Sequence, residues 1–316
     1  MSMPVDLERV GCPLGCAAGD DPVLTGRDRL HDLPGEFRVV RCRACGLMRT
    51  DPRPTLETIG FYYPLDYRPY LTTRVGPAAP AARPGAAGPF RRAVRRMLRP
   101  VGNQLPDLPP GRMLELGCGS GAFMHAMAGK GWVVEGIEPS PAAGSEARAL
   151  GYPVHIGPLE TAPDPAAPYD LTVGWMVLEH LHEPVAALEK VGRWSATGAW
   201  LVASVPDAGA WERRLFGDAW FALQVPGHLF HYTPRTLGLV LARAGWRLER
   251  VFWQDNPNNL LLSARYLALE RGWGRAAEAL QAMAHGERLH RTRSVLGKLL
   301  GRLRSSGRIT IWARRI

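Results

Sequence analysis

The chain has 316 residues, of which 46% are hydrophobic, and it carries a formal net charge of +10 at pH 7. This size and apolar content predict a soluble, globular protein with a substantial core. No apolar run of signal-peptide length opens the chain and no stretch of about 18 uncharged apolar residues occurs, so we expect a cytoplasmic protein without a transmembrane segment. The positive charge suits nucleic acid, an anionic membrane surface or phosphorylated substrates, and it does not decide the fold.

Four of the five cysteines form two close pairs, Cys12 with Cys16 and Cys42 with Cys45. Two such pairs can close a tetrahedral thiolate site, and in a reducing cytoplasm zinc is favoured over a disulfide. Residues 37–41 alternate as a strand does before the second pair, which is typical of zinc ribbons. We therefore predict structural Zn²⁺, because four cysteine ligands leave no coordination position for a substrate. The alternative is a metal-free knuckle.

The next three segments separate this module from the rest of the chain. Residues 61–70 contain five aromatic side chains, which either cap a pocket or pack the module against the main domain. Residues 73–89 are rich in Pro, Gly and Ala and indicate a linker. Residues 90–99 predict a basic amphipathic helix that contacts anionic lipid or RNA or, as we favour, packs on the sheet. The predicted domains are 1–72, the linker 73–89 and 90–316.

A strand followed by glycines is the central motif of the chain. Residues 113–116 predict a buried parallel strand, and a helix-favouring run begins at Ala122. The turn between them contains the three glycines Gly117, Gly119 and Gly121. A ligand can lie against the backbone N–H groups of such a turn. The next strand, 132–138, ends in Glu138. A βαβ unit places a carboxylate at this distance, about 20 residues on, beside the ribose hydroxyls of an adenosine ligand.

The run E-L-G-C-G-S-G followed by G-I-E-P-S resembles the class I methyltransferases that depend on S-adenosylmethionine (SAM). The dinucleotide fingerprint G-x-G-x-x-G would instead need a glycine at position 122. The resemblance implies a Rossmann-like, doubly wound, seven-stranded α/β sheet, with SAM bound by the glycine turn and Glu138. It also implies further residues of the SAM site: Glu115 at the methionine end, Cys118 as a small packing residue, Ser140, Met176, and Leu159 with Glu160 in the loop over the adenine. Ser140 is in addition the predicted N-cap of the helix 140–150.

The predicted fourth strand, 169–176, leads into Glu179 and His180. The carboxyl end of a central parallel strand borders the ligand crevice, so we expect both residues near the reactive end of the cofactor. A histidine beside a carboxylate can take a proton from an acceptor. The run L-E-H-L-x-x-P resembles a motif shared by many SAM methyltransferases, including ubiquinone-type O-methyltransferases. A structural role for His180 is the alternative.

After the predicted fifth strand, 200–206, an aromatic-rich insertion covers residues 207–232. It ends in P-G-H-L-F-H-Y-T-P, which resembles a segment of a broad bacterial methyltransferase family with a similar N-terminal cysteine module. Two histidines in an aromatic setting are candidates for acceptor binding or deprotonation, and we favour His228 over His231. The alternative is that Thr233 caps the helix 234–244 while His231 anchors it. The last two strands, 247–253 and 308–314, enclose a helical insertion at 256–306.

These features predict a SAM-dependent methyltransferase that acts on a small-molecule acceptor in secondary-metabolite or surface-glycan biosynthesis, by O- or C-methylation. One alternative is an RNA methyltransferase that binds through its basic surface and zinc module. A second is a non-catalytic scaffold that binds SAM and zinc. We expect the apolar side chains of the basic segment 294–304 to pack against the sheet edge. Peripheral contact of the basic helices at 90–99 and 294–304 with an anionic membrane is the alternative.

Overall fold

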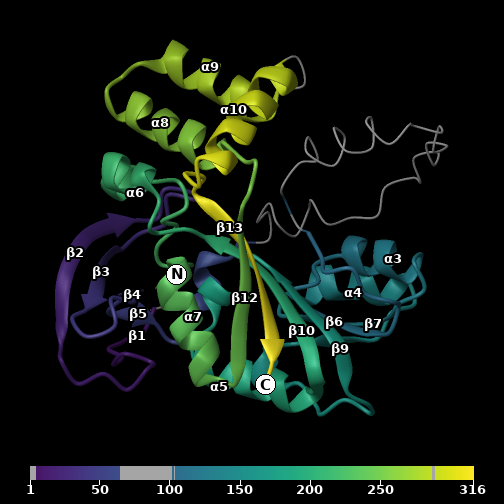
Figure 1. Ribbon diagram of the computed structural model, residues 1–316. Helices are drawn as coiled ribbons and strands as arrows, with labels where there is room; N and C mark the ends of the chain where they lie inside the picture. Colours follow the sequence, from purple (N-terminus) through teal and green to yellow (C-terminus); the bar gives the residue numbers. More distant parts are fainter. Residues whose placement is uncertain (1–4, 65–101, 103, 287–288) are drawn as a thin grey trace.

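The computed structural model describes residues 5–64, 102, 104–286 and 289–316 (Figure 1). The predicted linker at 73–89 and the predicted basic helix at 90–99 lie outside these described residues. So do Tyr67 and Tyr70 of the aromatic segment.

A seven-stranded sheet with the order β12-β13-β10-β9-β6-β7-β8 forms the main body. Its strands are β6 (Arg112–Leu116), β7 (Val133–Glu138), β8 (Val154–Ile156), β9 (Tyr169–Trp175), β10 (Ser195–Pro206), β12 (Trp246–Trp253) and β13 (Arg308–Arg315). β13 runs antiparallel to both of its neighbours, and the remaining pairs are parallel. This arrangement confirms the predicted Rossmann-like fold class.

Helices cover both faces of the sheet because successive side chains of each strand point to opposite sides. Met113 faces a core that includes Met124 and Ala147. Leu114 and Leu116 face a second core on the other side. The first core is completed by α3 (Ala122–Ala128) and α4 (Pro141–Ala149), and the second by α5 (Pro184–Trp194) and α7 (Pro234–Arg243).

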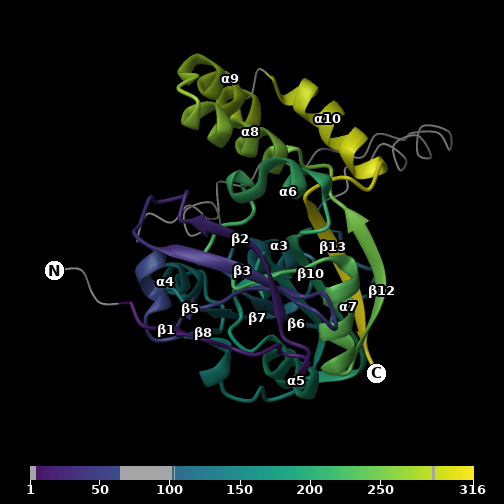
Figure 2. The ribbon, with the colours of Figure 1, turned by 90° about the vertical axis from the view of Figure 1, so that its left-hand side faces the viewer.

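The N-terminal module contributes a smaller sheet with the order β11-β4-β3-β2. Its strands are β2 (Asp20–Arg27), β3 (Glu36–Cys42), β4 (Met48–Thr50) and β11 (Phe230–His231), and beside it β1 (Leu7–Glu8) pairs with β5 (Arg53–Pro54). Figure 2 shows this sheet from its own side, with β2 and β3 toward the viewer. β11 comes from the second half of the chain, and its Phe230 and His231 lie opposite Arg49 and Met48. The module and the main body therefore share a sheet.

Three helices follow β12 in the chain and gather beyond one end of the large sheet (Figures 1 and 2). They are α8 (Asn258–Glu270), α9 (Gly274–His285) and α10 (His290–Arg302). The structure differs from the prediction that the apolar residues of α10 pack on the sheet edge. Leu300 is buried, but Val295, Leu299 and Leu303 are 68%, 53% and 64% exposed. The reason is that Gly297 faces the backbone of Asp255, so the small side of the helix packs inward.

Within the described residues, no helix combines the length and the apolar character that crossing a membrane requires.

A capping box fixes the start of α7. The Thr233 hydroxyl accepts a hydrogen bond from the backbone N–H of Thr236 at 3.2 Å, and the Thr236 hydroxyl accepts one from the N–H of Thr233 at 2.9 Å. We expect Thr233→Ala to lower the free energy of unfolding by about 1 kcal/mol, because an N-cap hydroxyl satisfies a helix donor that alanine leaves unpaired. Urea denaturation measures this loss. Thr292→Ala on exposed α10 is the control, and an equal loss there would contradict the capping explanation.

Candidate active site

The three glycines after β6 form a tight turn in the left-handed region. Gly117, Gly119 and Gly121 have φ values of +64°, +52° and +84°, which only glycine adopts without strain. A Cβ atom on Gly117 would lie 2.7 Å from Cγ2 of Val177, and one on Gly121 would lie 3.0 Å from Cβ of Ala147. The turn is therefore held closely between α4 and the segment that follows β9.

Glu115 lies under the first turn of α3, where it is only 3% exposed. Burial raises the pKa of its carboxyl well above the usual value, and a hydrogen bond from the backbone N–H of Met124 opposes that shift. Its Oε2 atom is buried and has no hydrogen-bond partner. A buried carboxylate with a free oxygen is costly without a compensating group, so this atom is suited to a cationic part of a ligand.

Glu138 closes the glycine turn from the end of β7. Its Oε2 atom accepts a hydrogen bond from the N–H of Gly119 at 2.8 Å, and its Oε1 atom accepts one from the N–H of Ser140 at 2.8 Å. Burial raises the pKa of the Glu138 carboxyl, and these two N–H groups act in the opposite direction. The structure thus brings the predicted ribose-binding carboxylate against the predicted cradle.

Two of the other predicted SAM-site residues have structural roles in the described geometry. The Ser140 hydroxyl accepts a hydrogen bond from the N–H of Ala143 at 3.4 Å and so caps α4, as predicted. Cys118 is 2% exposed and packs closely against Gly136. Burial raises the pKa of the Cys118 thiol, which disfavours the thiolate that a nucleophile would need.

The remaining predicted SAM-site residues lie in two other loops, which follow β8 and β9. Leu159 and Glu160 belong to the 3₁₀ turn η2 (Leu159–Thr161) after β8, where Leu159 is buried in the core and Glu160 is exposed. Met176 follows β9 with a φ of +59°, a rare value for a residue with a side chain. Its N–H donates to the carbonyl of Ser204 at 2.9 Å, which anchors this bend to β10.

Glu179, His180 and His228 meet in the interior, and we call these three residues the buried triad. One potential ligand atom of each lies within 4.8 Å of those of the other two, and the two imidazole ring centroids are 4.8 Å apart. Glu179 is completely buried in the 3₁₀ turn η3 (Leu178–His180). Among the described residues, neither of its carboxylate oxygens has a hydrogen-bond partner. The two sequence motifs predicted to carry the chemistry therefore converge.

Backbone carbonyls fix the tautomers of both triad histidines. Nδ1 of His180 lies 2.8 Å from the carbonyl oxygen of Gly227, and Nδ1 of His228 lies 2.9 Å from that of Ala222. Because a carbonyl can only accept, each Nδ1 carries the proton and each Nε2 presents a lone pair. The Tyr63 hydroxyl lies 2.8 Å from Nδ1 of His180 and donates to the same Gly227 carbonyl at 3.1 Å, which further orients that ring.

Burial also controls the charges of the triad. It lowers the pKa of His180 to about 4 and that of His228 well below the ordinary value, with the neighbouring His180 adding to the latter shift. It raises the pKa of Glu179 to about 8, and the backbone N–H of Glu179 itself and the positive charge of Arg308 oppose this shift. Both histidines are consequently neutral near pH 7.

His231 lies apart from the triad, on β11 of the small sheet. Its Nε2 atom is 3.4 Å from the Thr50 hydroxyl, and burial lowers its pKa to about 3, with a further contribution from Arg213. The neighbouring Tyr232 donates to the carbonyl of Leu178 at 3.2 Å. These contacts match the alternative in which this part of the segment anchors α7, whereas His228 lies close to Glu179 and His180.

A narrow hollow with a cavity volume of about 20 Å³ opens beside the triad. The N-terminal module and the main body both line it, through Asp28, Leu30, His31, Tyr62, Tyr63, His180 and residues 224–227. Sequence reasoning did not single out Tyr63, and the aromatic run at 61–70 was its signal. Tyr62 packs edge-on against Phe37 of the same module, in a core that also includes Trp220, while Tyr63 reaches His180.

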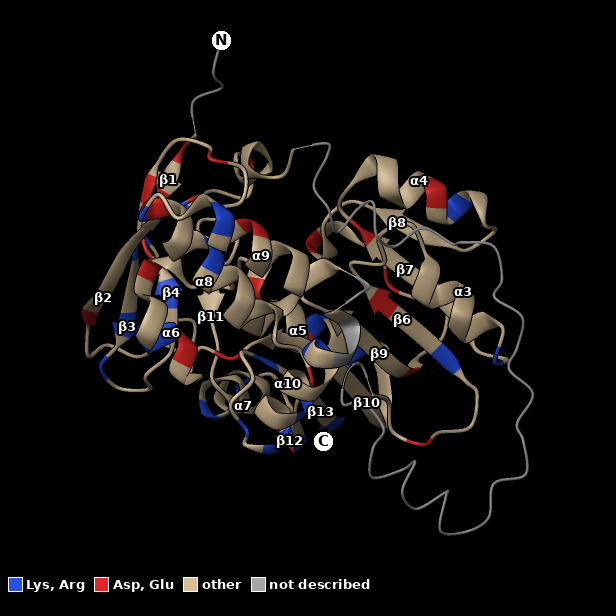
Figure 3. Ribbon diagram, turned by 90° about the horizontal axis from the view of Figure 1, so that it is seen from above, with Lys and Arg blue, Asp and Glu red and all other residues tan. Residues whose placement is uncertain are grey.

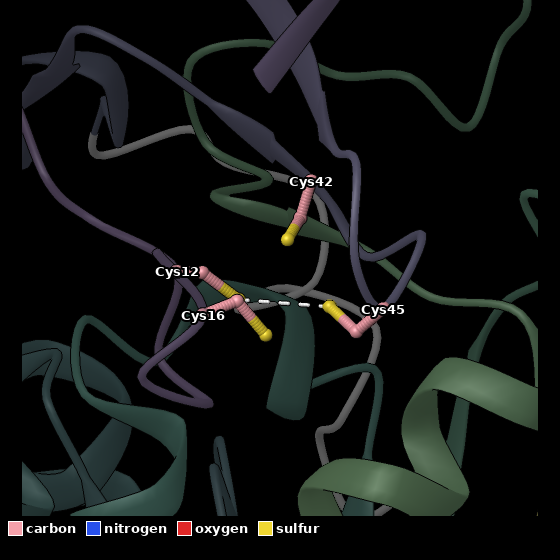
Figure 4. Close-up of side chains that lie close together, drawn as sticks. All are labelled: Cys12, Cys16, Cys42 and Cys45. Carbon is pink, nitrogen blue, oxygen red and sulfur yellow. Dashed lines mark hydrogen bonds between the residues drawn. The ribbon is translucent and has the colours of Figure 1, made fainter. Parts of the chain in front are cut away.

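The four N-terminal cysteines point toward one centre (Figure 4). Their sulfur atoms all lie within 4.8 Å of one another, and the Sγ atoms of Cys12 and Cys45 are 3.6 Å apart. Thiolates around a tetrahedral zinc ion at ~2.3 Å would be roughly 3.8 Å apart, so the donor set fits that ion. Burial alone would raise the pKa of Cys42, but the N–H groups of Cys45 and Ala44 lower it to about 7. Arg235 of α7 donates to the carbonyl of Cys45 at 3.2 Å.

Comparisons with known proteins agree with this geometry. A family model described as a methyltransferase domain matches residues 90–251. A search of curated proteins found no match.

Three similar solved structures are methyltransferases. A SAM-dependent methyltransferase from Mesorhizobium loti is 18% identical, with 72% of this chain and 99% of that chain covered and a TM-score of 0.45. One from Archaeoglobus fulgidus is 16% identical, with 72% and 91% covered and a TM-score of 0.43. Magnesium protoporphyrin IX methyltransferase from Synechocystis PCC 6803 is 14% identical, with 66% and 75% covered and a TM-score of 0.41.

The low pKa of the buried His231 makes the free energy of unfolding depend on pH. Because the folded pKa of about 3 lies below the ordinary value of 6.5, the unfolded chain binds the proton more readily, and acid removes stability. When the pH is lowered from 7.5 to 5, the free energy of unfolding should fall in both proteins. We expect this fall to be about 2 kcal/mol smaller in His231→Asn than in the unaltered chain. Urea denaturation at both pH values measures the difference. An identical pH dependence for the two chains would contradict the buried, neutral state of His231.

Proposed function

The chain belongs to the methyltransferase family whose domain spans residues 90–251, and we propose that it transfers a methyl group from SAM to a small-molecule acceptor. The reaction would be an O- or C-methylation in secondary-metabolite or surface-glycan biosynthesis, carried out in the cytoplasm. The observation that supports it most directly is the buried triad. It adjoins both the glycine turn, through the contact of Val177 with Gly117, and the hollow, through His180.

The residues around the turn fit SAM. The free Oε2 atom of Glu115 is a partner for the cationic amino group of the methionine part, and Glu138 is a partner for the ribose hydroxyls. Gly117, Gly119 and Gly121 hold the left-handed turn against which the cofactor would lie. Bound SAM supplies a methyl group on a sulfonium centre. Leu159, Glu160 and Met176 would border the adenosine and methyl ends from their loops.

The acceptor would bind in the hollow. His180 lines it, and His228 and Glu179 lie close to His180, so the triad can hold a polar group of the acceptor. Tyr63 and residues 224–227 enclose the acceptor from the other side. Holding the acceptor in line with the methyl group supplies much of the acceleration of such a transfer.

The charge distribution supports a small acceptor over RNA. Several arginines of the N-terminal module are paired with acidic residues, Arg43 with Asp21 at 2.7 Å and Arg49 with Asp20 at 2.7 Å. Figure 3 shows basic and acidic residues interspersed on this sheet. A phosphate backbone is instead bound by unpaired cations on one surface.

We also propose that Cys12, Cys16, Cys42 and Cys45 hold one structural Zn²⁺ ion. The ion would fix the turn after β3, which the carbonyl of Cys45 connects to Arg235 of α7. Zinc would thus hold the N-terminal module against α7 without taking part in the reaction.

Methyl transfer from labelled SAM into a lysate of the source cells, fractionated into small molecules, lipid, RNA and protein, tests the function. We expect label in the small-molecule fraction. Glu138→Gln should weaken SAM binding by about 1–3 kcal/mol in calorimetry, because it removes charge-assisted hydrogen bonds to a buried ligand. His180→Gln should keep SAM affinity but slow transfer at least tenfold, since the triad faces the acceptor.

The exposed His285 provides a matched control, and His285→Gln should change neither SAM binding nor transfer. Label in RNA would reject the small-molecule acceptor. SAM binding without label in any fraction would support the scaffold alternative. SAM affinity unchanged in Glu138→Gln would reject the assignment of the cofactor site.

Zinc content gives a separate test. We expect one zinc ion per chain by elemental analysis, and we expect a strong chelator to lower the unfolding temperature, because metal binding to the four thiolates adds to folding free energy. Cys45→Ser should lose the ion. A metal-free chain with unchanged stability in chelator would reduce the four cysteines to packing residues.

A further inference from the structure

We infer that the buried triad is a second metal site, which binds one divalent first-row transition-metal ion through Glu179, His180 and His228. The cysteine cluster and the triad are the two groups of three or more potential ligands that the described residues bring together. The triad differs in chemistry from the cysteine cluster, since it offers two imidazole nitrogens and a carboxylate. Such a set suits Zn²⁺, Fe²⁺, Mn²⁺ or Co²⁺ and leaves coordination positions open.

Hydrogen bonds to the backbone already orient both triad histidines for binding an ion. Nδ1 of each histidine donates to a backbone carbonyl, Gly227 for His180 and Ala222 for His228, and this leaves each Nε2 lone pair for a ligand bond. Histidines that bind metals are oriented by hydrogen bonds of this kind. The rings are in addition packed edge to face, with an interplanar angle of 75°. Neither ring needs a change of tautomer to bind an ion.

The carboxylate of Glu179 supplies the strongest argument. Glu179 has no exposed surface, and neither of its oxygens accepts a hydrogen bond from a described residue. An isolated buried carboxylate is highly unfavourable unless a cation or a donor compensates it. Arg308 interacts with it electrostatically, but the Arg308 Nε atom has no hydrogen-bond partner in the described residues either. A directly coordinated ion would satisfy both carboxylate oxygens, which the distant guanidinium does not.

The spacing and the access route are compatible with an ion. Ligand atoms at ~2.1 Å from one ion are about 3.0–3.4 Å apart, so the observed limit of 4.8 Å requires a contraction of at most roughly 1–2 Å. His180 also lines the hollow, and this gives an ion and its remaining ligands a path to the triad. The open coordination positions would face the proposed acceptor.

The charges around the triad indicate what the ion would bind next. A divalent cation, one carboxylate, two neutral histidines and Arg308 sum to two positive charges in a buried place, which favours an anionic oxygen ligand. This extension rests on the proposed function. It predicts an acceptor with a carboxylate or an acidic hydroxyl group, whose pKa the ion would lower.

Cobalt binding by the full-length chain tests the site in the absence of SAM and acceptor, so its outcome does not depend on methyl transfer. The chain is stripped with a chelator and titrated with Co²⁺ by calorimetry and visible spectroscopy. Cysteine thiolates give intense sulfur-to-cobalt charge-transfer bands, whereas the triad gives only weak d–d bands. We expect two equivalents to bind, one with each signature.

Glu179→Gln and His228→Asn should each weaken the second equivalent at least tenfold and leave the thiolate bands intact. The asparagine side chain can still donate to the Ala222 carbonyl, so the second variant keeps the fold testable. His231→Asn, a buried histidine outside the triad, should bind both equivalents. The proposal would be overturned if the unaltered chain bound only the cobalt ion that gives the thiolate bands. It would also be overturned if both triad variants still bound the second cobalt ion. Loss of the thiolate bands alone would overturn the zinc proposal and support the triad site.

Discussion

The pairing of β11 with β4 is the interaction on which the candidate site depends. It joins residues 230–231 to residues 48–50, and the N–H and hydroxyl of Thr50 donate to the carbonyls of Leu229 and His228 at 2.9 and 2.8 Å. These bonds fix the backbone that carries His228, and the N–H of Leu229 donates in turn to the carbonyl of Glu179 at 2.8 Å. A continuous hydrogen-bonded path therefore runs from the cysteine module to the triad. The N-terminal module therefore helps to position the candidate site.

The carboxyl edge of the large sheet concentrates buried negative charge. Glu115, Glu138 and Glu179 lie at or just beyond the ends of β6, β7 and β9, and each is at most 3% exposed. They differ in how many carboxylate oxygens have a hydrogen-bond partner. Glu138 accepts two backbone N–H bonds, Glu115 has one oxygen without a partner, and Glu179 has two. Burying a carboxylate costs free energy unless a partner offsets it. The uncompensated oxygens therefore identify the places where a cationic ligand gains most.

The sequence alone predicts those elements whose formation depends on residues that are neighbours along the chain. The seven strands of the large sheet, the glycine turn and the start of α4 at Ser140 follow from patterns within about ten residues, so composition and spacing predict them. The pairing of β11 with β4, across about 180 residues of sequence, has no such local pattern. The convergence of Glu179, His180 and His228 and the role of Tyr63 depend on that pairing. The exposed face of α10 escaped prediction for a related reason, since periodicity identifies an apolar face but not the partner that covers it.

This division between local and distant contacts also separates the two halves of the proposed reaction. The cofactor half, from Glu115 to Ser140, is built within one βαβ unit and can form whenever the large sheet forms. The acceptor half combines residues 28–31 and 62–63 of the N-terminal module with η3 and the segment at 224–228, so it exists only when the small sheet has closed. Val177 connects the halves, because it packs on Gly117 and lies two residues before Glu179. A change in acceptor specificity can therefore arise in the small sheet while the cofactor turn stays the same, which is how one methyltransferase fold accommodates different acceptors.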